Sequence, residues 1–247
     1  MAHRALLVDV TKCIGCGTCT EACQKANGQP AHQARGFDEQ TYTYLMDRGS
    51  DVYVRRLCMH CEHPACASVC PVKALVKTEA GPVTYDPAKC MGCRYCMMAC
   101  PNGVPTYEWH SATPRVRKCQ MCATRPGGSA CAEACPTGAT STGEREAMIA
   151  EAKRRVAEDP KTYYPTVYGL EEGGGTCVLY IGPKAPTELG LPRVANVELP
   201  DLTWKALKHV PDVVLFGGVF LGGMYWLTKR KDEVARAEGG RRENDHE

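Results

Sequence analysis

Four groups of four cysteines lie between residues 13 and 135 and constrain the fold more than any other feature of the sequence. Each group ends in a Cys-x3-Cys step, and a proline follows directly in three of them. Such an internal repeat indicates four copies of one kind of loop, each built to bind the same object. The groups are Cys13, Cys16, Cys19 and Cys23; Cys58, Cys61, Cys66 and Cys70; Cys90, Cys93, Cys96 and Cys100; and Cys119, Cys122, Cys131 and Cys135.

Iron–sulfur clusters, zinc ions and disulfides are the three uses of so many thiols that have to be distinguished. A disulfide framework is typical of secreted chains, but the opening residues MAHRALLVDVTKCIGC show no signal peptide. Zinc would favour two Cys-x2-Cys pairs separated by a finger. The first and third groups instead have the Cys-x2-Cys-x2-Cys-x3-Cys spacing of bacterial ferredoxins, in which the fourth cysteine ligates the other cluster of a pair. We therefore expect iron–sulfur clusters, with Cys23 serving a second cluster, and keep zinc and disulfides as alternatives.

The order of the cysteines, from CIGCGTCTEAC to CQMCATRPGGSACAEACP, resembles the four-cluster, ferredoxin-type electron-transfer subunits of membrane-bound respiratory oxidoreductases, such as those of formate dehydrogenase and nickel–iron hydrogenase. The resemblance covers residues 5 to about 145. It implies an α+β fold in which two dicluster ferredoxin-like units, one inserted in the other, form a domain at 1–145 with the inner unit at 58–100.

The same resemblance implies four [4Fe-4S] clusters, each held by three cysteines of one group and one cysteine of another. The long loop of the fourth group would turn at Gly127 and Gly128. The implied ligand sets are set 1, Cys13, Cys16, Cys19 and Cys135; set 2, Cys23, Cys119, Cys122 and Cys131; set 3, Cys58, Cys61, Cys66 and Cys100; and set 4, Cys70, Cys90, Cys93 and Cys96.

Four further residues near the cysteine groups or in apolar runs need an interpretation. His60 and His63 lie inside the second group, but sixteen thiolates already satisfy four cubanes, so we expect neither histidine to bind iron. Cys177, the remaining cysteine, lies in the strand-like apolar run GGGTCVLYIG and is expected to be a small buried hydrophobe. Lys118 is interpreted either as a cation that raises a cluster potential or as an ordinary surface charge.

Short strands and helices are expected around the loops. HRALLVDVTKC and GPVTYDPAKC each predict a strand that runs into a cysteine loop, whereas residues 27–56 are interpreted as an insertion with little chemistry. After the fourth group, GEREAMIAEAKRRVAEDP has the apolar spacing of a helix that stops before Pro160. We assign residues 146–207 to a C-terminal extension that makes subunit contacts.

A membrane-spanning helix is predicted at 208–229. Residues 213–227 carry no charge, and Tyr225 and Trp226 suit the membrane interface. Gly218 and Gly222 would allow close packing on another membrane helix, whereas a buried helix of a soluble protein is the alternative. The basic residues that follow predict a cytoplasmic tail at 230–247 and a cluster domain on the periplasmic face of a bacterial inner membrane. Because no export signal is visible, the resemblance implies export together with a partner that carries a twin-arginine signal.

The expected function is electron transfer without catalysis by this chain. The net charge of +2 signals neither nucleic acid nor an acidic partner, and no phosphate loop, nucleophile motif, pterin site or flavin site is visible. The resemblance implies a large catalytic partner of the molybdenum or tungsten pterin or nickel–iron type, and a membrane cytochrome b or similar quinone-reactive partner. Electrons would run from formate or hydrogen to quinone. The alternatives are a subunit of a molybdopterin reductase fed by quinol, and a membrane-tethered polyferredoxin.

Overall fold

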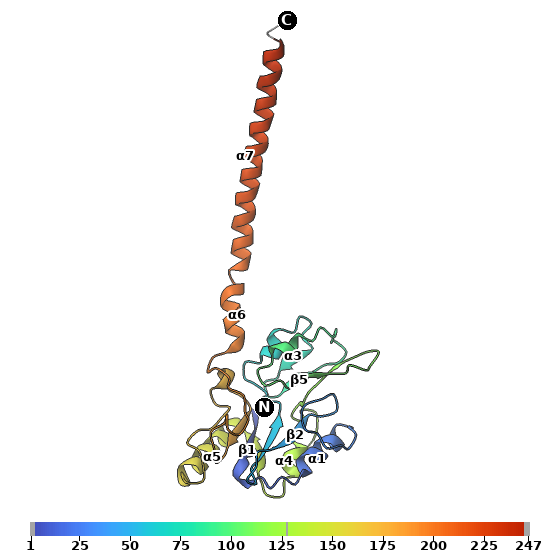
Figure 1. Ribbon diagram of the computed structural model, residues 1–247, viewed down its shortest axis with the longest axis vertical. Coiled ribbons are helices and arrows are strands. Elements are labelled where there is room, and N and C mark those ends of the chain that lie inside the picture. The colour runs from blue at the N-terminus through green and yellow to red at the C-terminus, as the bar shows by residue number, and fades with distance from the viewer. Residues whose placement is uncertain (1–2, 127, 245–247) are drawn as a thin grey trace. The chain divides into compact units, whose positions relative to one another are not determined.

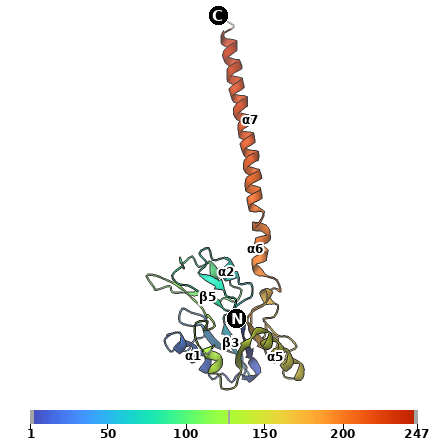
Figure 2. The same ribbon diagram turned by 180° about the vertical axis from the view of Figure 1, so that it is seen from behind.

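The computed structural model describes residues 3–126 and 128–244, so Gly127, which was expected to turn the fourth loop, lies outside the described residues. The chain divides into two compact units, Met1–Pro200 and Asp201–Glu247. The first unit contains every cysteine, and its elements are drawn in Figures 1 and 2. We describe each unit by itself.

A three-stranded sheet forms the centre of the first unit, in the order β8-β1-β9. The middle strand β1 (Arg4–Asp9) is the one predicted from HRALLVD, and its residues after Arg4 are buried. It pairs antiparallel with β8 (Thr140–Glu144) and parallel with β9 (Val178–Ile181). The parallel pair aligns Leu6 with Val178, so the segment after the last cysteine group supplies an edge of the central sheet.

Three two-stranded hairpins accompany the central sheet. The first, β2 (Thr43–Asp47) with β3 (Tyr53–Leu57), occupies much of the segment that was interpreted as an insertion. The second joins β4 (Leu75–Lys77) to β5 (Val83–Tyr85), and the third joins β6 (Thr106–Tyr107) to β7 (Val116–Arg117). The strand predicted from GPVTYDP is therefore confirmed as β5.

Each cysteine group contributes one short helix to the first unit. These helices are α1 (Thr18–Ala26), α2 (Ala65–Ser68), α3 (Tyr95–Ala99) and α4 (Ala130–Glu133), and a single 3-10 turn η1 (Val10–Lys12) precedes the first loop. Helix α1 packs against α4, and α2 packs against α3. Figure 1 shows α1 and α4 side by side at one end of the unit, while α3 lies at the other end with β5.

Helix α5 (Arg145–Glu158) confirms the helix predicted after the fourth group and packs on the central sheet. Its apolar residues meet a core cluster that includes Leu7, Ala152, Leu179 and Ile181. A 3-10 turn η2 (Glu172–Gly174) then leads into β9. Burial of both faces of the sheet explains why β1 and β9 have nearly continuous apolar sequences.

The second unit is helical. Helix α6 (Leu199–Leu207) begins at the boundary, and α7 (Val210–Asn244) extends well beyond the predicted span at 208–229. The segment Leu199–Arg236 is the one part of the described chain that is long and apolar enough to cross a membrane. None of its most apolar window is buried against the rest of the chain, so this chain does not enclose it as the core helix of a soluble protein. Such a surface requires lipid or a partner.

Candidate metal centres

The four cysteine loops share one backbone feature that the sequence shows only in part. The residue directly before the second cysteine of each group has a left-handed backbone, with φ of +70° at Gly15, +49° at His60, +74° at Gly92 and +53° at Met121. Glycine is the residue that adopts this conformation without strain, and only two of the four positions have it. The shared conformation supports the inference that the groups are copies of one loop.

Gly15 and Gly92 also have close neighbours that a side chain would meet. A Cβ atom on Gly15 would lie 2.8 Å from the ring of Tyr53, and one on Gly92 would lie 2.8 Å from the hydroxyl of Tyr107. Both loops are therefore packed against aromatic side chains of neighbouring hairpins. Glycine is favoured at these two positions by the backbone angle, and a Cβ atom would require the neighbouring tyrosine side chains to shift.

The thiols of set 1 meet around one cavity. This cavity is lined by Cys13, Cys16 and Cys19 of the first group together with Cys135 of the fourth. Burial raises the pKa of Cys13, and the neighbouring thiols of Cys19, Cys135 and Cys16 raise it further. The structure thus brings together three cysteines from one loop and one cysteine from a loop more than a hundred residues away in the sequence.

The thiols of set 4 meet around a second cavity. Cys90, Cys93 and Cys96 of the third group and Cys70 of the second group line it. Burial raises the pKa of Cys96 to about 11, and the other three thiols add to this effect. The arrangement is again three thiols from one group and one from another.

The thiols of set 2 also lie near one another. Burial raises the pKa of Cys23 to about 12, with neighbouring Cys131 and Cys122 contributing. Burial likewise raises the pKa of Cys119 well above its ordinary value, and Cys23 and Cys131 are among the thiols that raise it further. Cys23 is therefore surrounded mainly by thiols of the fourth group.

The thiols of set 3 form the fourth neighbourhood. Burial raises the pKa of Cys61, and the thiols of Cys58, Cys100 and Cys66 raise it further. Every sequence-predicted ligand is thus found near members of its own set, although the bonds to iron that the ligand sets imply stay a prediction.

The donor chemistry of these neighbourhoods suits an iron–sulfur cluster. Crowded thiols that are mostly buried keep their protons unless metal cations compensate the negative charge of the thiolates. Backbone amides also point at sulfur: Ala74 N lies 3.2 Å from Cys70 Sγ, and Met121 N lies 3.3 Å from Cys119 Sγ. Such hydrogen bonds to sulfur help to set the potential of a bound cluster. All the cysteines are free, so the disulfide alternative is wrong.

The two histidines of the second group make contacts typical of structural residues. His60 is buried, and its Nδ1 accepts a hydrogen bond from Val83 N at 2.9 Å. Burial, together with the cations of Lys118 and Lys77, lowers the pKa of His60 well below its ordinary value, so the ring is neutral. His63 Nδ1 lies 3.2 Å from a carboxylate oxygen of Glu198 on the half-exposed surface. That neither histidine binds iron stays a prediction.

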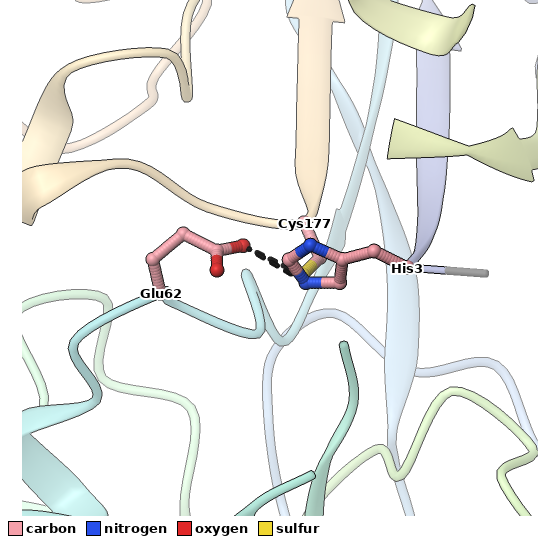
Figure 3. A group of neighbouring side chains, drawn as sticks. All are labelled: His3, Glu62 and Cys177. Atoms are coloured by element: carbon pink, nitrogen blue, oxygen red, sulfur yellow. Dashed lines mark hydrogen bonds and ion pairs between the residues drawn. The ribbon is translucent and has the colours of Figure 1, made fainter. Parts of the chain in front are cut away.

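Cys177 is fully buried, as the sequence predicted, but it lies directly before β9 and its thiol contacts polar side chains, so the expectation of a simple hydrophobe is wrong. Its Sγ lies 3.0 Å from Glu62 Oε1, 3.5 Å from His3 Nε2 and 3.1 Å from Lys77 Nζ. Figure 3 shows His3 and Glu62 converging on the cysteine. Burial raises the pKa of Cys177 to about 12, and the carboxylate of Glu62 reinforces this shift. The residue is a protonated thiol within a polar group.

His3, Glu62 and Cys177 have the donor types of a metal site, but two cations already occupy the group. Lys77 Nζ and Arg145 Nε both lie 3.3 Å from Glu62 Oε1. Burial alone would raise the pKa of Glu62, but the Cys177 thiol and the nearby cations, led by Lys77, lower it. A divalent ion would have to displace or tolerate both cations. The group is better described as a network that anchors Glu62, the residue after Cys61, to the start of β9.

Arg55 is a site residue that the sequence interpretation missed, because it lies in the segment 27–56 that was assigned little chemistry. It is buried on β3 and lines the cavity of set 1. Lys118 is also buried, so the surface-charge interpretation of that residue is wrong. Its Nζ donates a hydrogen bond to the backbone oxygen of Cys119 at 2.8 Å. The adjacent pair Arg55 and Arg56 in a strand was the one signal, because successive side chains of a strand point to opposite faces, so one of the two arginines faces inward.

The central sheet, the paired cluster helices and the four thiol neighbourhoods define an iron–sulfur protein of the dicluster ferredoxin class. Comparison with known families agrees. Two family models match, each described as a 4Fe-4S dicluster domain, over residues 12–74 and 50–145. The zinc alternative therefore finds no support in the family matches.

Similar proteins place the chain more narrowly. It is 33% identical to the hydrogenase-2 operon protein HybA of Escherichia coli O157:H7, over 98% of this chain and 88% of that protein. It is 31% identical to the formate dehydrogenase iron-sulfur subunit of Haemophilus influenzae, over 91% of this chain and 80% of that one. A selenate reductase subunit of Mesobacillus selenatarsenatis is 31% identical over 65% of this chain and 71% of that protein. The chain belongs to this family of iron–sulfur electron-transfer subunits of membrane-bound oxidoreductases.

Proposed function

We propose that this chain relays electrons through four [4Fe-4S] clusters between a catalytic subunit and a membrane partner. The observation that carries the proposal is the assembly of sixteen thiols into four neighbourhoods, each combining three cysteines of one group with one of another. The clusters would supply one-electron redox centres when bound. The chain itself contributes the thiolate ligands, the amide donors to sulfur and a buried setting.

The proposed arrangement is one dicluster unit inserted in another, at 58–100 within 1–145. The packing of α1 on α4 supports the outer unit, and the packing of α2 on α3 supports the inner one. In both pairs, the last cysteine of each group lies within a short helix or just after it, and it reaches the neighbourhood of the partner group. Residues 146–207 then form the extension, 208–229 the membrane helix and 230–247 the tail.

The thiol sets follow one another as a series, which supports electron transfer from one cluster to the next. Cys19 of set 1 has Cys131 of set 2 among its neighbours, and Cys119 of set 2 has Cys58 of set 3. Cys66 of set 3 has Cys96 of set 4. The chain would therefore hold the redox centres in the order 1, 2, 3, 4, each within short reach of the next.

The two ends of this series reach the surface. Cys16 of set 1 and Cys93 of set 4 are the exposed cysteines. Large apolar side chains are exposed beside them, including Ile14 next to set 1 and Met98, which is 87% exposed, next to set 4. Exposed apolar patches on a soluble unit mark interaction surfaces. We infer that the catalytic subunit and the membrane partner dock at these two ends.

The apolar part of α7 supports membrane anchoring of the subunit. We propose a single-pass helix in a bacterial inner membrane, with the basic residues Lys229, Arg230 and Lys231 on the cytoplasmic side and the cluster unit in the periplasm. The membrane partner would be a cytochrome b or similar quinone-reactive protein. The names of the relatives favour a hydrogenase or formate dehydrogenase as the catalytic partner, and this chain would then be non-catalytic.

The second candidate is the same relay in the opposite direction, from quinol to a molybdopterin reductase. The similarity to the selenate reductase subunit favours keeping it. Metal analysis of the complex, purified from membranes in mild detergent without oxygen, distinguishes the hosts. Nickel indicates a hydrogenase, and molybdenum or tungsten indicates a pterin enzyme whose direction an assay with formate and quinone then tests. Iron without a co-purifying large subunit would support a membrane-tethered polyferredoxin instead.

Iron and sulfide content test the number of clusters, since four cubanes contain about 16 of each. The Cys23→Ser substitution tests the ligand sets. We expect it to damage the cluster shared with Cys119 and to leave that of Cys13 intact, because Cys23 lies among the thiols of set 2. Loss of the Cys13 cluster alone would refute the pairing. Cys177→Ala is the matched control, and it should retain all the iron.

A further inference from the structure

Arg55 is a buried cation that forms no ion pair with a carboxylate in the described part of the chain. Its side chain comes from β3, and the residue is 2% exposed. Its Nε donates to Thr43 Oγ1 at 3.0 Å, and its Nη1 lies 3.3 Å from Thr140 Oγ1. Among the residues that the structure describes, no aspartate or glutamate forms an ion pair with it. Two neutral hydroxyls do not compensate a buried positive charge, so the charge balance has to come from elsewhere.

The groups that face the guanidinium are cysteines of two ligand sets. Arg55 lines the cavity of set 1. The thiols of Cys131, Cys19 and Cys23 and the hydroxyl of Tyr180 lie close enough to the guanidinium to act on its charge. Cys19 belongs to set 1, while Cys23 and Cys131 belong to set 2. The guanidinium therefore lies where the two thiol sets of the outer unit adjoin.

We propose that Arg55 is the internal counter-charge of the two clusters held by sets 1 and 2, and that it raises their reduction potentials. The inference rests on the proposed function. A thiolate-ligated cluster carries net negative charge, and adding an electron increases that charge. A fixed cation in a buried site therefore stabilises the reduced form more than the oxidised form. Arginine suits this role because it stays protonated when buried.

A structural role for Arg55 is the competing explanation. Its two hydrogen bonds tie the β2–β3 hairpin, through Thr43, to β8, through Thr140. The two roles differ in what they require. A counter-charge needs any cation at this place, whereas the structural role needs the planar guanidinium that reaches both hydroxyls. Arg55→Lys keeps a cation at this place but loses the planar guanidinium that reaches both hydroxyls. Arg55→Gln loses the charge.

The experiment is a redox titration of the detergent-solubilised complex, followed by electron paramagnetic resonance, with iron and sulfide assayed on the same samples. In Arg55→Gln we expect the ratio of reduced to oxidised clusters in sets 1 and 2 to fall about tenfold at a given potential. For one electron, this equals a reduction potential that is lower by about 59 mV. The clusters of sets 3 and 4 serve as internal references, and their reduction potentials should not change. Arg55→Lys should keep most of the native potential.

Arg154→Gln is the matched control, because Arg154 is an exposed arginine of α5 that pairs with Glu151 and Glu158. It should leave all potentials unchanged. Unchanged potentials in Arg55→Gln with full iron content would overturn the inference, as would an equal shift in Arg55→Lys. If Arg55→Gln does not accumulate, the lysine variant decides: native potentials support the counter-charge, and equal failure assigns Arg55 a structural role. Absence of [4Fe-4S] signals from the unmodified complex would instead refute the proposed function.

Discussion

Replacing Arg155 by methionine should destabilise the cluster unit at the start of its first cysteine loop. Arg155 on α5 donates to the fully buried carboxylate of Asp9 at 3.0 Å, and Asp9 ends β1 directly before η1. The same side chain of Asp9 accepts hydrogen bonds from Tyr163 Oη at 2.9 Å and from Thr11 N at 3.1 Å. The ion pair thus connects the C-terminal extension to the turn that leads into Cys13.

The size of the effect follows from the unpaired charge that the variant leaves behind. Removing one partner of a buried ion pair costs about 3–5 kcal/mol. Because the hydrogen bonds from Tyr163 and Thr11 remain, we expect a loss near the lower limit, about 3 kcal/mol. With the slopes usual for guanidinium chloride, this corresponds to a fall in the unfolding midpoint of about 0.5–1.5 M.

The assay is denaturation by guanidinium chloride under anaerobic conditions, followed by the visible absorbance of the clusters and by far-ultraviolet circular dichroism. Arg154→Met is the control, since its exposed ion pairs should matter little. The double variant Asp9→Asn/Arg155→Met should recover most of the loss, because it removes the uncompensated charge. A midpoint unchanged in Arg155→Met, or lowered as far in Arg154→Met, would refute the reasoning.

Three further predictions concern single residues and the second unit. Cys177 should resist alkylation in the folded protein at pH 8 and react after unfolding, because it is buried and its pKa is raised to about 12. Mass spectrometry of labelled peptides checks this prediction, and rapid labelling of the folded protein would contradict it. Gly15→Ala should lose iron more readily than Gly17→Ala, since both have a left-handed backbone but only Gly15 lies against Tyr53; equal iron retention would count against the packing argument. Removing residues 208–247 should leave a brown protein that no longer sediments with membranes, and continued membrane association in the absence of partners would show that α7 is not the anchor.

The ligand types and the class of the protein could be read from the sequence because iron–sulfur spacing is a local property. Three cysteines at x2 spacing wrap one cluster within a single loop, so the loop around Cys13 predicts its chemistry without knowledge of the rest of the chain. The strand β1, the helix α5 and the apolar part of α7 were predictable for the same reason, since each depends on the periodicity of neighbouring residues.

Other features depend on contacts between distant segments, and only the tertiary structure decided them. The family resemblance implied which cysteine groups pair, but the neighbourhoods arise from the packing of α1 on α4 and of α2 on α3. His60 and Met121 have a left-handed backbone although neither is a glycine, so the sequence did not predict this conformation. Cys177 lies in an apolar run, yet its thiol meets Glu62 and Lys77 from segments a hundred residues earlier. Arg55 is buried because the β2–β3 hairpin folds over two thiol sets. A buried charge needs compensating groups, and here they come from distant segments of the chain and not from residues next to Arg55 in the sequence.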